Sequence, residues 1–139
     1  MPGINTTRVL IGGLAAGLVR NISESVLNMA VLAKDMADAM ARFNLPMIGG
    51  AQIGVFMVLG FVIGIVMTWV YAAIRPRFGP GPKTACFAGM AVWFLAYLYG
   101  GIGMLNMGFF PMRPMIISMT WGLVEVLVAI NVGAYLYKE

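Results

Sequence analysis

The chain has 139 residues, of which 61% are hydrophobic and only 10% charged, and its mean hydropathy is +0.91. Soluble domains carry about 25% charged residues, so this composition predicts an integral membrane protein of one domain without a separate soluble part. The net charge of +4 comes from nine dispersed Lys and Arg residues, which indicate membrane topology rather than a surface for nucleic acid.

Several kinds of chemical site are excluded by residue type. The sequence contains no histidine and a single cysteine, Cys86, which excludes an internal disulfide, a multi-thiolate metal site, histidine-ligated haem and histidine-based catalysis. The stretch FGPGPK lacks the length and the flanking strand of a phosphate-binding loop, so we expect no nucleotide. Methionines near the third connection could bind Cu(I), but adaptable apolar packing explains them better. We therefore expect no metal, no cofactor and no enzymatic activity.

Four stretches are predicted to cross the membrane. Residues 51–74, 84–105 and 115–137 are continuous apolar runs, each long enough to span about 30 Å of hydrocarbon as a helix. Residues 8–33 form two shorter apolar halves separated by charged residues, and we interpret them as one interrupted span. The predicted fold is an all-α, four-transmembrane-helix bundle that makes one membrane domain over residues 1–139.

Residues 34–44, KDMADAMARFN, are predicted to form an amphipathic helix. Opposite charges recur four residues apart, at Lys34 with Asp38 and at Asp38 with Arg42, and apolar residues occupy the other face. We expect this segment to extend the first helix beyond the membrane. An interfacial helix that lies flat on the membrane is the alternative.

The connection RPRFGPGPK carries Arg75, Arg77 and Lys83, and its prolines are expected to end the second helix. Because cytoplasmic loops are enriched in Lys and Arg, this connection is predicted to be cytoplasmic. Four spans then place both termini in the cytoplasm as well.

Charged side chains within the spans are the most unusual feature of the sequence. On a helical projection one face of the first span combines small with polar residues, namely Gly13, Gly17, Arg20, Glu24 and Asn28. The fourth span carries Glu125 at similar depth, on a face with Ser118, Gly122 and Ala129. An unpaired charge at the centre of a membrane helix costs about 2.5 to 3.5 kcal/mol. We therefore predict that these two faces pack together and that Arg20 lies between Glu24 and Glu125.

Asparagines at a similar depth are expected to complete the hydrogen bonds of this predicted cluster: Asn21, Asn28 or Asn131. One arginine against two carboxylates leaves one negative charge, so either a carboxyl group is protonated or a cation, water or partner approaches. Three roles remain open for the cluster. It can fix which helices face each other, form part of an ion or proton path, or contact another protein's span or a lipid headgroup.

Small residues four apart, at Gly60 and Gly64 in the second span, allow close helix packing. The pattern fits a dimer seam and packing within one bundle equally well.

The stretches WVYAAIRPRFGPGPKTA, residues 69–85, and GGLAAGLVRNISESVLN, residues 12–28, resemble small four-span inner-membrane proteins of bacteria that have no assigned function. The resemblance implies a bacterial inner-membrane location and transfers no activity or site residue. We expect an accessory or scaffold subunit that contacts membrane lipid and packs against other membrane subunits or copies of itself. The alternative is a small channel or transporter for protons or a cation that uses Glu24 and Glu125.

Overall fold

The first span is interrupted close to where its charged residues lie. The computed structural model describes residues 3–138, and its first helix, α1 (Thr6–Val26), is capped by the side chain of Asn5. It continues into a short π-helix, η1 (Leu27–Val31). The helix is then interrupted at Leu32, before α2 (Ala33–Arg42). The helical character of residues 34–42 is as predicted. The extension is nevertheless a separate helix, because the π turn and the non-helical backbone of Leu32 interrupt α1.

The second span, α3 (Gly50–Phe78), is longer than predicted. It passes through Pro76 and ends at Phe78, and the next residue, Gly79, has a φ of 82°, which favours glycine. The prediction that the prolines of this connection stop the helix is wrong for Pro76. A proline in the last turn removes one hydrogen bond, and the next residues still find helical acceptors. Arg75 and Arg77 therefore lie in the last turn of α3, and Lys83 lies in the first turn of the next helix.

The third span consists of three consecutive helical segments: α4 (Pro82–Trp93), the π-helix η2 (Phe94–Tyr99) and α5 (Gly100–Asn106). The fourth span is α6 (Met112–Leu136). Within residues 3–138, four helices are thus long and apolar enough to cross a membrane, and the protein is a multi-pass, all-α membrane protein. Among the described residues there is no strand.

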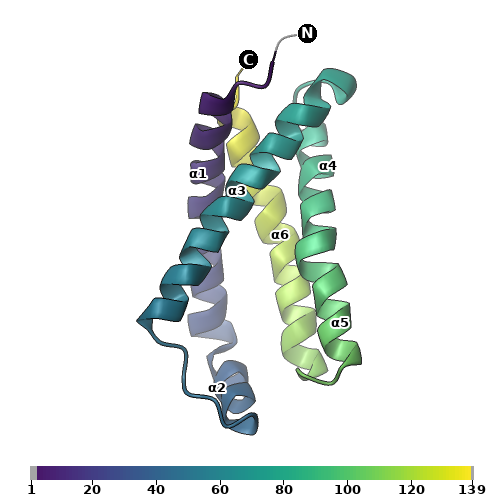
Figure 1. Cartoon of the computed structure of the whole chain (residues 1–139). Coiled ribbons are helices and arrows are strands. Elements are labelled where there is room, and N and C mark those ends of the chain that lie inside the picture. The colour runs from purple at the N-terminus through teal and green to yellow at the C-terminus, as the bar shows by residue number, and fades with distance from the viewer. Residues whose placement is uncertain (1–2, 139) are drawn as a thin grey trace.

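The four spans alternate in direction, so the connections gather at two ends of the bundle (Figure 1). At the first end, which we call the terminal end, the hydroxyl of Tyr137 accepts a hydrogen bond from the Asn5 backbone, and its ring packs edge-on against Tyr71. At the second end, the α2 end, Asp35 of α2 forms an ion pair with Arg113 of α6 at 2.7 Å. These contacts tie the start of the chain to its end and α2 to the start of α6.

One of the two ion pairs predicted within α2 is present. Lys34 lies 2.6 Å from Asp38. Arg42 instead donates to the carbonyl of Gly108 in the last connection, over 3.4 Å. The contact with another part of the chain replaces the predicted local pair.

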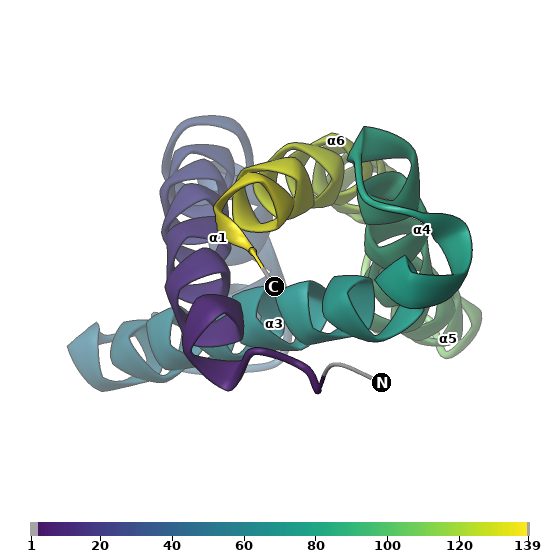
Figure 2. The same ribbon diagram turned by 90° about the horizontal axis from the view of Figure 1, so that it is seen from above.

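Seen from above, α1 and α4 lie on opposite sides of the bundle, and both pack against α3 and α6 (Figure 2). Glycines make the tightest of these contacts. A Cβ atom on Gly13 would lie 2.5 Å from the Cα of Ile65, and one on Gly17 would lie 2.7 Å from the Cα of Phe61. Gly60 and Gly64 form the other side of this seam between α1 and α3.

The role predicted for Gly13 and Gly17 is therefore corrected. We expected them to approach the fourth span, but they face α3. The glycine of α1 that contacts α6 is Gly12, on the adjacent side of the helix. A Cβ atom on Gly12 would meet the carbonyl oxygen of Gly133 at 2.5 Å. Small residues on two sides of α1 let it approach two helices at once.

The bundle is not packed equally along its length. The buried core lies nearer the terminal end and includes Met67, Ala72, Val126 and Ile130. Towards the α2 end, α3 diverges from the other spans (Figure 1), and every residue from 50 to 59 is exposed. Ten consecutive residues of an apolar helix are thus exposed on every face.

Candidate functional site

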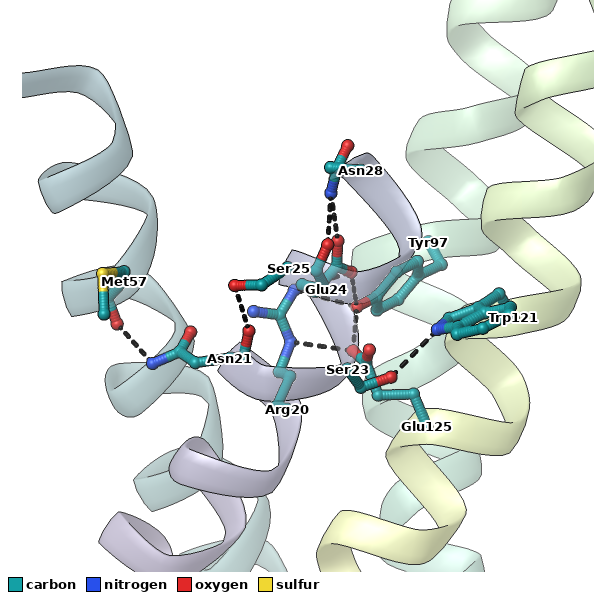
Figure 3. A network of polar contacts seen from close by, with 10 residues as sticks. All are labelled: Arg20, Asn21, Ser23, Glu24, Ser25, Asn28, Met57, Tyr97, Trp121 and Glu125. Atoms are coloured by element: carbon teal, nitrogen blue, oxygen red, sulfur yellow. Dashed lines mark hydrogen bonds and ion pairs between the residues drawn. The ribbon is translucent and has the colours of Figure 1, made fainter. Parts of the chain in front are cut away.

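A polar cluster lies between α1, the third span and α6 (Figure 3). We define it as Arg20 and Glu24 of α1, Tyr97 of η2 and Glu125 of α6. The cluster joins three of the four spans.

The predicted arrangement of the charges is present. Arg20 Nη2 lies 3.6 Å from Glu24 Oε1, one helical turn away, and Arg20 Nε lies 3.5 Å from Glu125 Oε1 across the bundle. The side chain of Glu125 is 0% exposed, that of Arg20 13% and that of Glu24 26%. Burial in low dielectric strengthens such contacts and makes pairing of the charges necessary.

Tyr97, which the sequence analysis did not single out, lies at the centre of the cluster. Its hydroxyl oxygen accepts a hydrogen bond from Arg20 Nη2 at 2.8 Å, and it lies 2.8 Å from Glu24 Oε1 and 2.9 Å from Glu125 Oε1. The sequence does indicate that Tyr97 has a polar contact, because a tyrosine far from a span end needs a hydrogen-bond partner for its hydroxyl group. The sequence contains no indication of the partner.

Two local features direct Tyr97 towards the charges. It lies within a π-helix, whose wider turn changes the direction of side chains relative to a regular α-helix. Gly122 of α6 makes room for the ring, because a Cβ atom there would lie 2.5 Å from Tyr97 Cδ1. We predicted that Gly122 would approach the first span, but it faces the third.

The three asparagines predicted to complete the cluster have different positions. Asn28, in η1, donates to Glu24 Oε2 at 3.1 Å and also to the Glu24 carbonyl. Asn21 points to α3 instead, where it donates to the carbonyl of Met57. Asn131 bonds to Leu127 O and approaches Cys86 Sγ, two turns from the charges. Only Asn28 therefore contacts the cluster.

A second hydrogen bond joins α1 to α6 beside the cluster. Trp121 Nε1 donates to the hydroxyl of Ser23 at 2.9 Å (Figure 3). This bond and the Arg20–Glu125 pair fix the rotation of α1 relative to α6, because each requires a defined face of both helices.

Chemically, the cluster can hold charge and protons. Its groups are a guanidinium, two carboxyls and a phenol. Nucleophilic catalysis would require a nucleophile activated by a neighbouring base. Within residues 3–138 no three or more His, Cys, Asp or Glu side chains are grouped so as to hold a metal ion. Comparisons with protein-family models, with curated proteins and with solved structures find no match for this chain.

Proposed function

We propose that this protein is a non-enzymatic subunit that assembles in the membrane with another membrane protein through the exposed N-terminal third of α3, residues 50–59. The observation that carries the proposal is the exposure of all ten of these residues on every face of the helix. An apolar segment of this kind is also compatible with lipid as its only neighbour. Gly54 within the segment and polar side chains of the first span, however, favour a protein partner.

Two features support a partner rather than lipid. Gly54 has open space where a Cβ atom would stand, although glycines further along the same helix are in close contact with α1. In the first span, Ser25 of α1 and Asn28 of η1 are exposed polar side chains. Glycine pairs and polar groups at membrane depth are typical of helix–helix contacts, and polar groups facing lipid are costly. A transmembrane helix of a partner would cover both.

The arrangement of the core supports a packing role over the alternative of a channel or transporter. Between the polar cluster and the terminal end lie fully buried side chains, among them Met67, Val126 and Ile130. They pack with Ala16 and Ala129, which are also 0% exposed. A conduit within one chain would need a hydrated route past these residues.

The test is purification of the full-length, tagged chain from its own membrane in a mild detergent, followed by size estimation and mass spectrometry. We expect a stoichiometric membrane partner. Gly54→Ile should release the partner without unfolding the chain, because the added side chain enters open space. Gly103→Ile is the matched control, since Gly103 of α5 is also exposed and open.

Recovery of the chain as a monomer, or retention of the partner by Gly54→Ile, would contradict this proposal. A complex that contains only copies of this chain would make the partner helix that of a second copy. Proton or cation flux through liposomes that contain the purified chain, abolished by Glu125→Gln, would favour the channel or transporter instead.

For orientation, we propose that the terminal end faces the cytoplasm of a bacterial inner membrane. This end carries five basic residues, Arg8, Arg75, Arg77, Lys83 and Lys138, whereas the α2 end carries Lys34, Arg42 and Arg113. The excess of positive charge supports this orientation.

A further inference from the structure

The hydroxyl group of Tyr97 has more short polar contacts than one proton can serve. Its oxygen lies 2.8 Å from Arg20 Nη2, 2.8 Å from Glu24 Oε1 and 2.9 Å from Glu125 Oε1. A phenol carries one proton and accepts hydrogen bonds through its oxygen. Arg20 can only donate, so the Tyr97 proton is available to one of the two glutamates.

If both glutamates were ionised, one carboxylate oxygen would face the Tyr97 oxygen at hydrogen-bond distance with no proton between them. One protonated carboxyl group removes this conflict. It donates to Tyr97, and Tyr97 donates to the other carboxylate, so that every short contact contains one proton. The same assignment makes the cluster electrically neutral, with Arg20 balanced by one ionised glutamate.

The surroundings of the two glutamates differ. Glu24 Oε2 accepts a hydrogen bond from Asn28, as expected for an ionised carboxylate. Glu125 Oε2 is buried without a well-formed hydrogen bond, although the Ser23 hydroxyl lies beside this carboxyl group, and the side chain is 0% exposed. A buried carboxylate with an unsatisfied oxygen is far more costly than a neutral carboxyl group in the same place.

We propose that Glu24, Tyr97 and Glu125 form a binding site for one proton, which resides on Glu125 and exchanges with Glu24 through the Tyr97 hydroxyl. In the transfer, the Glu125 O–H bond breaks as the proton joins the Tyr97 oxygen. At the same time the Tyr97 O–H bond breaks and its proton joins Glu24 Oε1. Two protons each shift by one hydrogen bond, so the net result is the transfer of one proton from Glu125 to Glu24. No group is oxidised or reduced, and the reverse transfer restores the starting state.

Every element packed around the site contributes a defined group. α1 presents Arg20 and Glu24, the third span presents Tyr97, and α6 presents Glu125. α3 presents Gly60, so its contact with Arg20 adds no charge. Glu24, at 26% exposed, is the more accessible carboxyl group and is one helical turn closer to α2 than Arg20, so exchange with water takes place through Glu24. The proposal is independent of any partner protein.

The test is infrared spectroscopy of the full-length chain in liposomes at neutral pH, because a protonated carboxyl group has its own C=O stretching band. The chain has only five Asp and Glu residues, so few groups can contribute. We expect one such band, shifted when glutamate is labelled with ¹³C. Glu125→Gln and Glu24→Gln should each abolish it, because Arg20 then faces a single carboxyl group that ionises. Asp38→Asn, at an exposed position, is the control that keeps the band.

Two further variants locate the proton. Tyr97→Phe should shift the frequency of the band, because the carboxyl group loses its hydrogen-bond acceptor. Asn28→Ala should leave the frequency unchanged, because Asn28 bonds to Glu24 and not to Glu125. Absence of the band in the native chain, or its persistence in either glutamine variant, would overturn the site. A shift in Asn28→Ala would overturn the assignment to Glu125.

Discussion

Tyr97 and Glu24 are 73 residues apart in sequence, and the hydroxyl of one lies 2.8 Å from the carboxylate of the other within the membrane-spanning bundle. The contact joins the third span to the first. Arg20 and Glu125 converge on the same hydroxyl, so one oxygen atom links three helices.

Tyr97→Phe is expected to destabilise the protein. It removes one oxygen and leaves Arg20 Nη2 and the Glu125 carboxyl without their shared partner, and an unsatisfied buried polar group costs about 1 to 3 kcal/mol. The measurement is thermal unfolding in detergent. Tyr99→Phe is the matched control, because Tyr99 is two residues away and 72% exposed. Equal stability of the two variants would contradict the role of the Tyr97 hydroxyl.

Gly64→Ala is expected to loosen the seam between α1 and α3. A Cβ atom on Gly64 would lie 2.5 Å from the backbone nitrogen of Gly17, and backbone on both sides leaves no flexible atom to move. We expect a cost of about 1 to 3 kcal/mol, the range for overpacking, measured as loss of stability on heating. Gly103→Ala, at an open position, should be nearly neutral. An equal loss of stability in Gly103→Ala and Gly64→Ala would contradict the prediction, because the cost would then not come from the close packing of the seam.

Stability at high pH should depend weakly on Lys34. Its hydrogen bond to Asp38 raises the pKa of Lys34 above its ordinary value of 10.5. A raised folded-state pKa gives stability that is complete at neutral pH and is lost as the pH rises through that pKa. The side chains of Lys34 and Asp38 are 87% and 65% exposed, so salt should weaken the effect. Titration of Lys34 by NMR should show its pKa falling in Asp38→Asn. An unchanged pKa would mean that the ion pair does not persist in solution.

Labelling with a membrane-impermeant thiol reagent should separate the two ends of the bundle. In a Cys86→Ser background, single cysteines at Ile4 and Pro80 of the terminal end should react from one side of the membrane. Cysteines at Met47 and Met107, near the α2 end, should react from the other. Reaction of Ile4→Cys and Pro80→Cys from opposite sides would contradict the four-span topology. The side on which this pair reacts tests the proposed cytoplasmic location of the termini.

The sequence by itself determined the four spans and the meeting of Arg20, Glu24 and Glu125. Apolar runs of this length can satisfy their backbone in a membrane as helices, and charges at their centre must find each other because lipid offers no solvation. The periodicity of a helix also predicted a small-residue face on α1. These conclusions follow from the length and residue pattern of each span and from the cost of an unpaired charge in lipid.

Only the tertiary structure decided which partner each face meets. Gly13 and Gly17 pack against α3 and not α6, Gly122 makes room for Tyr97, and Asn21 and Asn131 point away from the charges. Glycines on more than one side of α1 permit close approach by either neighbour, so sequence spacing does not choose between them. The two π-helices change the phase of side chains without any residue that marks them, and one of them carries Tyr97 into the cluster.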